Sequence, residues 1–455
     1  MAEGHSELPA TALAVAQARL DTLDALGRRV IRAATIFGNV FWRSGIVELL
    51  APDTPEVEVY RQLATLADRE LITTRAESRI AGEREYVFRH VLLREAAYAA
   101  LSDDDRRLGH RMAADWLASH GETDPMMLAE HYDRGGIGEH AARCYHRAAV
   151  EALAGNDAAA VHARVERAFE LTEDRELQGK LLALDAEAHR WNAEYAQAAA
   201  VARRALEHFP AGCAEWFEVC GEAGHAAALA VDFTFAEEVA RELVARTPGP
   251  AALTSWTVAC AKLAARLLLA ERREPAESLL AAISLAPPAE AAIASAWLLR
   301  AHSLRASVGD RALAPALMGE SAALFAAEGD ERNAAVQRLN QVEGLCELGA
   351  FDEALEALEA VEARAARLPA HFRYHALDAR AMIAIYSDRP ERCPPTSPAA
   401  LARVPDTRNT GLLFLDLAEV RRRAGQLDEA RALIARAMPV LDAYPATAAG
   451  AHAVT

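Results

Sequence analysis

The stretches GAFDEA at residues 349–354 and GQLDEA at residues 425–430 decide the fold of this chain. Each begins with glycine, has a bulky residue two positions later and ends with alanine. AEYAQA at residues 193–198 repeats the bulky residue and the final alanine at the same spacing. Another apolar residue follows seven positions after the bulky one. Because residues three to four and seven positions apart share one face of a helix, the pattern predicts an amphipathic helix that begins directly after a tight turn.

Weaker copies extend this pattern over most of the chain. Counted at the bulky residue or its equivalent, the eight copies lie 36 to 42 residues apart. A period of this length holds two helices, and one helical hairpin cannot bury its apolar face alone, so neighbouring hairpins must stack into a solenoid. The eight positions are Ala158, Tyr195, Phe233, Pro275, Arg311, Phe351, Pro390 and Leu427.

Small residues and prolines support the division into hairpins. We expect alanine in the second helix to allow close packing, glycine to form the turn between the helices, and proline to stand near the ends of second helices. The five prolines from Pro390 to Pro405 predict a break or hinge. The residues concerned are Ala198, Ala354 and Ala430 for packing, Gly309, Gly349 and Gly425 for the turn, and Pro210, Pro248, Pro287 and Pro369 for the helix ends.

The first seventy residues read as three helices. The apolar spacing predicts one amphipathic helix over residues 11–36 and a second that carries Phe41 and Trp42. A third helix is predicted over Glu56–Asp68, with a capping oxygen before the proline of its first turn.

A β-hairpin is predicted next, because β-favouring residues at 71–74 and 86–88 flank a turn at Gly82. Three helices followed by a hairpin is the winged-helix order, and only helical patterns follow from Val91 onward. The sequence therefore predicts an all-α protein. We expect a winged-helix-like module carrying a β-hairpin at residues 1–101, a helical linker at 102–138, an α-solenoid of helical hairpins at 139–441 and a frayed tail at 442–455.

The composition restricts the classes of function. Of 455 residues, 52% are hydrophobic and 25% charged, so the chain can bury a core. The formal charge of −17 disfavours nucleic acid and acidic membrane surfaces as partners. Six cysteines without a CxxC pair fit a reducing cytosol. We expect neither a signal peptide nor a membrane span, since no run of about 18 uninterrupted apolar residues occurs.

The repeat resembles the tetratricopeptide repeat over residues 139–441, although the period is longer than that family's and the tryptophan of its first helix is mostly missing. The N-terminal part resembles the region after the nucleotide-binding core of STAND-type regulatory ATPases, which occur in bacterial signalling proteins. This second resemblance implies a winged helix, a helical linker and a sensor array. The matching stretches are Leu8-Pro9, residues 17–20, residues 29–38 with Phe41-Trp42, and residues 88–98.

No catalytic chemistry is carried over with the resemblance. The family's nucleotide-binding core would precede residue 8. The sequence has no GxxxxGK[ST] loop and no kinase glycine-rich loop, HRD or DFG set. His131 and His140 could suggest a metal site, but glycines at 135 and 136 separate them. We therefore expect a protein that is not an enzyme, with no catalytic residue, cofactor or metal.

Two sets of residues are candidates for contacts. Solenoids bind partners in their concave groove, and a basic inner face would suit an acidic peptide or a C-terminal carboxylate. At the strand-to-helix junction, a switch contact to a nucleotide-binding or kinase domain in trans competes with a structural role, which we favour for His90. The groove candidates are Lys262, Arg266, Arg300, Asn340, Arg373 and Arg380; the domain-contact candidates are Phe88, Arg89, His90 and Arg94.

The sequence thus predicts a cytoplasmic interaction scaffold or sensor in bacterial signal transduction that binds a protein or peptide in the solenoid groove. One alternative is a transcriptional regulator that binds DNA through its winged helix. The mixed charges of Glu56–Asp68 argue against it, because a DNA-reading helix needs a positive surface. Another alternative is the regulatory part of a split STAND ATPase or serine/threonine kinase.

Overall fold

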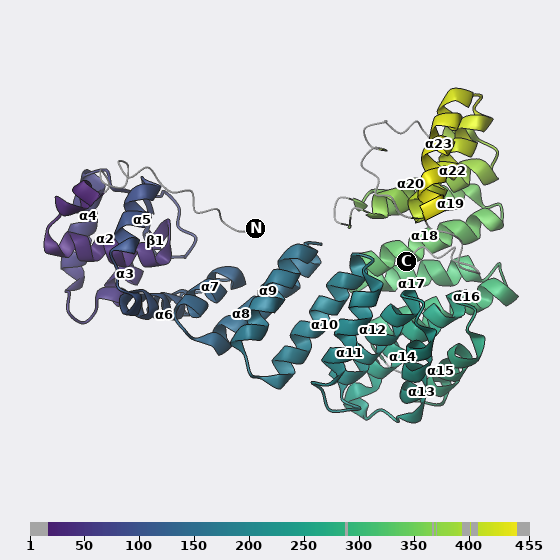
Figure 1. Cartoon of the computed structure of the whole chain (residues 1–455), viewed down its shortest axis with the longest axis horizontal. Coiled ribbons are helices and arrows are strands. Elements are labelled where there is room, and N and C mark those ends of the chain that lie inside the picture. Colours follow the sequence, from purple (N-terminus) through teal and green to yellow (C-terminus); the bar gives the residue numbers. More distant parts are fainter. Residues whose placement is uncertain are drawn as a thin grey trace. The chain divides into compact units, whose positions relative to one another are not determined.

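The structure is a computed structural model that describes residues 17–286, 290–365, 368–369, 371–393, 401 and 408–443. The described chain is almost entirely helical (Figure 1). Its contacts define two compact units. The first comprises Met1–Ala152 and Ala159–Leu181, and the second comprises Leu153–Ala158 and Leu182–Thr455. This division does not follow the predicted domain boundaries at 101, 138 and 441, which stay predictions.

The first unit contains a three-stranded antiparallel sheet with the order β1-β3-β2. Val87 of the central strand lies opposite Val40 on one side and Thr73 on the other. The predicted β-hairpin is confirmed as β2 and β3. The elements are α2 (Ala25–Phe37), β1 (Val40–Trp42), α3 (Arg43–Leu50), α4 (Glu56–Asp68), β2 (Ile72–Thr74) and β3 (Glu85–Phe88).

Three details predicted for this region are wrong. The helix predicted over residues 11–36 is interrupted, because Asp24 caps α2 and its carboxylate accepts a hydrogen bond from the Gly27 amide. Phe41 and Trp42 lie in β1 rather than in a helix, since aromatic side chains fit a half-buried strand. Finally, Pro55 stands at the N-cap of α4 without a side-chain hydrogen bond, so the expected capping oxygen is not used.

Five further helices complete the first unit. Ser102 caps α6, with its hydroxyl accepting from the Asp105 amide at 3.1 Å, and Asp124 caps α7 in the same manner. Both starts agree with the predicted helices. The elements are α5 (Val91–Ala99), α6 (Asp103–Ser119), α7 (Pro125–Arg134), α8 (Gly138–Ala154) and α9 (Ala158–Leu171).

The predicted repeat is confirmed by the pairing of helices. In each hairpin the first helix ends shortly before a repeat position and the second begins at or near it. The first helices are α8, α10 (Arg175–Trp191), α12 (Ala214–Leu229), α14 (Leu253–Leu269), α16 (Ala292–Gly309), α18 (Glu331–Glu347), α20 (His371–Tyr386) and α22 (Arg408–Arg423).

The second helices begin at the repeat position itself in five hairpins, at Ala158, Tyr195, Phe233, Phe351 and Leu427. The two helices predicted at Pro275 and Arg311 start two residues earlier and three residues later, respectively. The second helices are α9, α11 (Tyr195–Leu206), α13 (Phe233–Ala245), α15 (Arg273–Leu285), α17 (Ala314–Ala327), α19 (Phe351–Glu362) and α23 (Leu427–Ala443); η3 (Pro390–Arg392) takes this place in the seventh hairpin and η1 (Pro250–Ala252) precedes α14.

The turn inside seven of the eight described hairpins has one residue in the left-handed conformation. Gly349 and Gly425 both have φ of 76°, as glycine allows without strain. Gly309 does not form such a turn, because it is the last residue of α16. In five hairpins the same place, two residues before the second helix, holds a non-glycine residue with φ between 53° and 65°: Asn156, Ala193, Val231, Glu271 and Asp388.

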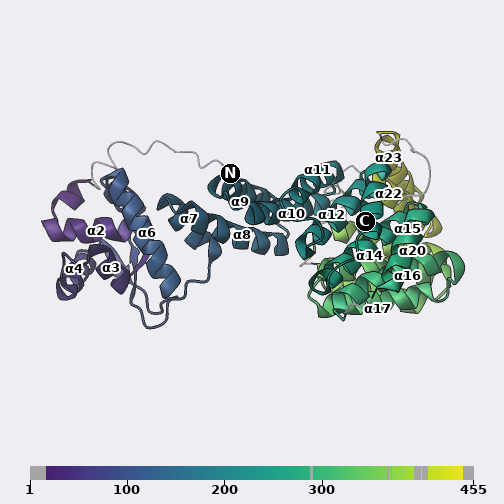
Figure 2. The same cartoon turned by 90° about the horizontal axis from the view of Figure 1, so that it is seen from below.

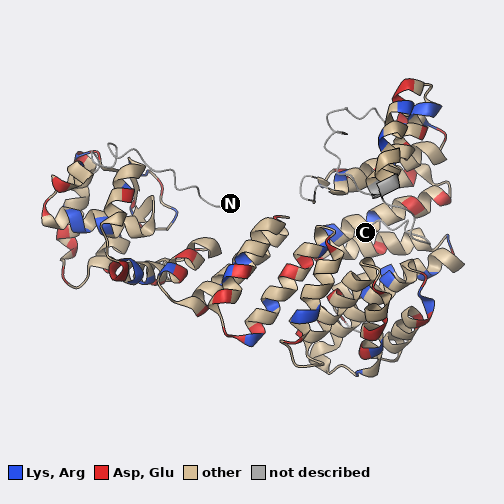
Figure 3. Cartoon of the chain, in the orientation of Figure 1, with Lys and Arg blue, Asp and Glu red and all other residues tan. Residues whose placement is uncertain are grey.

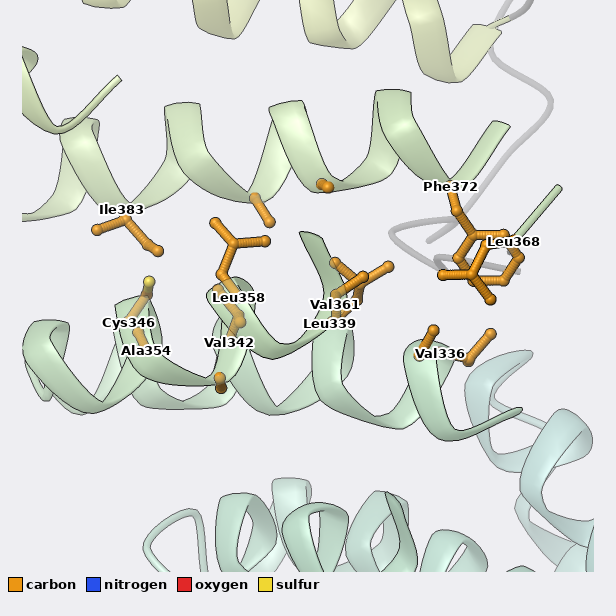
Figure 4. Packing of buried hydrophobic residues seen from close by; sticks show 14 residues of the cluster. Val336, Leu339, Val342, Cys346, Ala354, Leu358, Val361, Leu368, Phe372 and Ile383 are labelled. Carbon is orange, nitrogen blue, oxygen red and sulfur yellow. The ribbon is translucent and has the colours of Figure 1, made fainter. Parts of the chain in front are cut away.

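Close packing of successive hairpins forms the core of the second unit. Figure 4 shows side chains of α18, α19 and α20 in one buried cluster, with Leu358 between the two other helices. The predicted packing residues Ala198, Ala354 and Ala430 are buried. Helices α12, α14 and α16 lie side by side in both views (Figures 1 and 2). One segment, Pro250–Leu269, is long and apolar enough to cross a membrane, but it contains α14, which packs between α12 and α16.

Some predictions concern residues that the structure does not describe. The break predicted over Pro390–Pro405 is described only up to Cys393 and at Leu401, and η3 is the short helix at its start. The tail predicted at 442–455 lies outside the described residues beyond Ala443.

Candidate binding site on the first helices

A buried carboxylate joins three neighbouring first helices of the second unit. Glu222 of α12 accepts hydrogen bonds from Arg190 of α10 and from Lys262 of α14. All three side chains are at least 86% buried. Burial alone would raise the pKa of the Glu222 carboxyl, but the charges of Arg190 and Lys262 outweigh it and lower this pKa to about 2. Glu222 is therefore ionised and bridges two cations.

Two more cations lie nearby, one on α14 and one on the next first helix, α16. Arg266 follows Lys262 by one turn on α14, and Arg300 of α16 is only 4% exposed. Within the described parts of the chain, no carboxylate oxygen lies within 4.0 Å of either guanidinium group. Burial, followed by the charges of Arg266 and Arg190, lowers the pKa of Arg300 to about 9. Positive charge at this site is therefore only partly neutralised.

Neutral side chains hold Arg300 in place. With its amide oxygen turned toward Arg300, Gln337 of α18 accepts from the guanidinium Nε at 3.2 Å and from Nη1 at 3.3 Å. The guanidinium carbon lies 5.2 Å from the ring centre of Trp297, within the range of a cation–π contact. These contacts orient the group but supply no negative charge.

The imidazole of His225 on α12 lies in the positive electrostatic field of this cluster. Its side chain is buried, and burial, followed by the charges of Lys262, Arg190, Arg300 and Arg266, holds its pKa well below the usual value. The imidazole is therefore neutral. Its Nδ1 has no hydrogen-bond partner among the residues described.

Contacts within the second unit join helices that are far apart in the sequence. Arg332, at the start of α18, lies 3.8 Å from Glu187 of α10, and its Nε donates to Asn156 Oδ1 at 2.8 Å. Trp191 of α10 lies 6.4 Å from the ring of Phe372 on α20. Helices α10 and α18 are separated by seven helices in the sequence and yet touch. Residues of α10 therefore contact residues of α18 and α20 within the second unit.

The structure brings together three of the six groove candidates, Lys262, Arg266 and Arg300. Asn340 lies half-buried on α18, and Arg373 is exposed on α20. Arg380 is engaged elsewhere, since its Nε donates to Glu362 Oε1 at 2.9 Å. A role in binding stays a prediction for all six.

Sequence reasoning missed Arg190, Glu222 and Arg332. The repeat held a signal for Glu222, because it precedes the start of its second helix by the same number of residues as Lys262 does in the next hairpin. Nothing in the local sequence pointed to Arg332, because its partners lie several hairpins earlier in the chain.

The four domain-contact candidates occupy different environments in the first unit. Phe88 ends β3 and packs in the core, with its ring centre 5.3 Å from that of Phe41. Arg89 pairs with Glu70 at 3.2 Å. His90 stands exposed at the N-cap of α5 without a capping side-chain bond, and Arg94 is half-buried. A contact to another domain stays a prediction for these residues.

Other candidates considered from the sequence have structural surroundings. His131 Nδ1 lies 3.1 Å from His110 Nδ1 in the core of the first unit, and the His140 ring lies tilted against that of Tyr132, with 5.2 Å between the ring centres. On α4, Arg61 pairs with Glu58, so the charges of this helix are mixed rather than basic. Figure 3 shows red and blue segments interspersed along the helices of the first unit.

No protein-family model matches the sequence, and neither does any curated protein. Among solved structures, the chain is similar to a STAND protein (signal transduction ATPase with numerous domains) with a tetratricopeptide repeat sensor from Pyrococcus horikoshii. The identity is 15%, the match covers 96% of this chain and 67% of that chain, and the TM-score is 0.53. The two proteins therefore share a fold over nearly the whole of this chain.

Two further solved structures match at lower TM-scores. One is a Rap protein complexed with competence and sporulation factor, with 15% identity, coverage of 77% of this chain and 91% of that chain, and a TM-score of 0.39. The other is the APC/C hetero-tetramer Cut9–Hcn1, with 12% identity, coverage of 76% and 88%, and a TM-score of 0.19. These TM-scores do not establish a common fold.

Proposed function

We propose that this chain is a non-catalytic sensor or scaffold that binds a protein or peptide partner on the first helices of its second unit. The observation that carries the proposal is the partly neutralised cluster of Arg190, Glu222, Lys262, Arg266 and Arg300 on that face. Charged side chains on the inner face of a helical solenoid suit a partner of complementary charge. The shared fold with a protein that carries a tetratricopeptide repeat sensor supports a sensor role.

We further propose that the N-terminal module contacts a nucleotide-binding or kinase domain in signal transduction, as STAND-type organisation would require. Arg89, His90 and Arg94 are accessible at the β3–α5 junction. Co-purification with such a domain tests this. The paired substitution His90→Ala and Arg94→Ala should reduce recovery, whereas Arg61→Ala on exposed α4 should not.

The partner surface is tested by charge reversal on the two sides of the solenoid. Arg373 is exposed on the first helix α20, and Arg241 is exposed on the second helix α13. The partner is captured with the full chain and identified by mass spectrometry, and its affinity is then measured for both variants. Arg373→Glu should weaken binding while Arg241→Glu leaves it unchanged. Loss only in Arg241→Glu, or equal retention in both, would contradict binding on the first helices.

A further inference from the structure

Two buried cations of the second unit, Arg266 and Arg300, have no carboxylate oxygen within 4.0 Å among the described residues, although Arg190 and Lys262 on first helices nearby do. Arg190 and Lys262 share the carboxylate of Glu222. Arg300 is more deeply buried than Lys262 and contacts the neutral Gln337 amide and the Trp297 ring, and the charge of Asp330 offsets the burial of its guanidinium only in part. A buried charge is unfavourable unless an opposite charge or several hydrogen bonds compensate it. The fold therefore leaves positive charge that an added anion would neutralise.

The charge of Arg266 acts on Arg300, so the two groups without a carboxylate partner lie near each other. Lys262 and Arg266 are four residues apart and share a face of α14, while Arg300 occupies on the adjacent helix α16 a place close to that of Lys262 on α14. Two buried nitrogens here, Arg266 Nε and His225 Nδ1, have no hydrogen-bond partner among the residues described. Both belong to side chains of helices that carry the cluster, α14 and α12.

We propose that Arg266 and Arg300 form a binding subsite for a compact oxyanion, a carboxylate or phosphate group, which enters beside the Arg190–Glu222–Lys262 bridge. Guanidinium groups present two parallel N–H donors to such anions. Because Gln337 and Trp297 already orient Arg300, little side-chain freedom is lost on binding. Glu222 does not repel the anion strongly, since its charge is shared by two cations.

This subsite rests on the proposed function, in which the oxyanion belongs to a peptide as its C-terminal carboxylate, an acidic side chain or a phosphorylated residue. The same chemistry would also accept free inorganic phosphate. A peptide would also contact residues outside the subsite, whereas free phosphate would not. The experiment therefore compares peptides with free oxyanions.

The test measures the melting temperature and binding heat of the full chain with inorganic phosphate, sulfate, acetate and chloride at constant ionic strength. Phosphate or acetate should raise the melting temperature saturably above the chloride reference. Arg300→Met and Arg266→Met should each weaken oxyanion binding at least tenfold, whereas Arg241→Met, at an exposed position of the second helix α13, should not. Without oxyanion, Arg300→Met should be at least as stable as the wild type, because an uncompensated buried charge has been removed.

The outcomes separate this inference from the proposed function. If small oxyanions bind and acidic or C-terminally free peptides do not, the subsite stands and the peptide partner is rejected. If peptides bind equally with free and amidated C-termini, to wild type and to both arginine variants, the subsite is rejected and the partner surface stands. No saturable effect of any oxyanion or peptide beyond chloride would overturn the subsite. If the Arg300→Met variant does not fold, the oxyanion affinity of the Arg266→Met variant decides the question.

Discussion

Arg332 Nη1 lies 3.8 Å from Glu187 Oε1, although helices α11 to α17 separate the two residues in the sequence. Arg332 also donates hydrogen bonds to Asn156 Oδ1 and to the Leu153 carbonyl, and its guanidinium carbon lies 5.2 Å from the Trp191 ring. One side chain at the start of α18 therefore ties together residues of the early hairpins. This contact links α18 to α10, the first helix that carries Arg190.

Removing this contact should destabilise the second unit. Arg332→Met removes the ion pair with Glu187 and the hydrogen bonds to Asn156 Oδ1 and the Leu153 carbonyl, so we expect a loss of about 1–3 kcal/mol in the free energy of unfolding. Thermal unfolding followed by circular dichroism measures it. The control is Arg305→Met, because Arg305 and Glu277 form a half-exposed pair at 3.5 Å that should contribute less than about 1 kcal/mol. Equal losses in the free energy of unfolding for the two substitutions would show that the Arg332 contacts add no more stability than a half-exposed ion pair.

The contact between α12 and α14 depends on Gly221, the residue before Glu222. A Cβ atom at this position would lie 2.8 Å from the Ala259 Cα atom of the backbone, which cannot move away as a side chain would. We expect Gly221→Ala to lower the free energy of unfolding by about 1–3 kcal/mol through overpacking and to weaken partner binding, since α12 carries Glu222. Gly249→Ala is the matched control, because nothing lies within 4 Å of its added Cβ. A Gly221→Ala protein as stable as this control would disprove the close approach.

One turn residue carries a backbone conformation that its side chain disfavours. Val231 has φ of 65° and is 69% exposed, so its side chain gains little packing in return. Asparagine tolerates this conformation and occupies the equivalent turn at Asn156. We expect Val231→Asn to raise the free energy of unfolding by about 1 kcal/mol. The control is Val244→Asn in helix α13, where the backbone is helical and the substitution should not raise the free energy of unfolding. An increase there as large as at Val231 would contradict the explanation by backbone conformation.

The buried histidine pair should make the first unit acid-sensitive. Burial, followed by the positive charge of its neighbours, lowers the pKa of His110 to about 3 and that of His131 to about 4. Both are neutral in the folded state, whereas the unfolded chain binds protons near pH 6.5. Stability is therefore fully present above pH 6.5 and declines as the pH falls toward 4, by up to about 1.4 kcal/mol for each pKa unit and group.

Titration of the imidazole resonances by NMR measures this directly. His131→Gln can still hydrogen-bond to His110 and should reduce the slope of stability against pH, while His90→Gln, at an exposed position, should not. Titration of either buried ring near pH 6.5 in the folded protein would contradict the assignment.

The repeat could be predicted from the sequence because its cause is local. Phe351, Leu427 and Tyr195 start second helices as expected, since the spacing of apolar and small residues along one helix decides which face packs. The starts of α6 and α7 also have a local cause, because the capping residues Ser102 and Asp124 act within one turn. The strand at Val40–Trp42 was missed, because a short apolar run takes its structure from the strand with which it pairs.

The sequence by itself determined the all-helical repeat, its period and the places of most turns, because backbone preference and side-chain periodicity operate over a few neighbouring residues. The candidate site was decided only by the tertiary structure. Three of its arginines and lysines could be suspected singly, but whether each is paired depends on Glu222 and Gln337 in other hairpins. The stacking of hairpins sets which charges are buried together, and a buried charge takes its energy from neighbours that are remote in the chain.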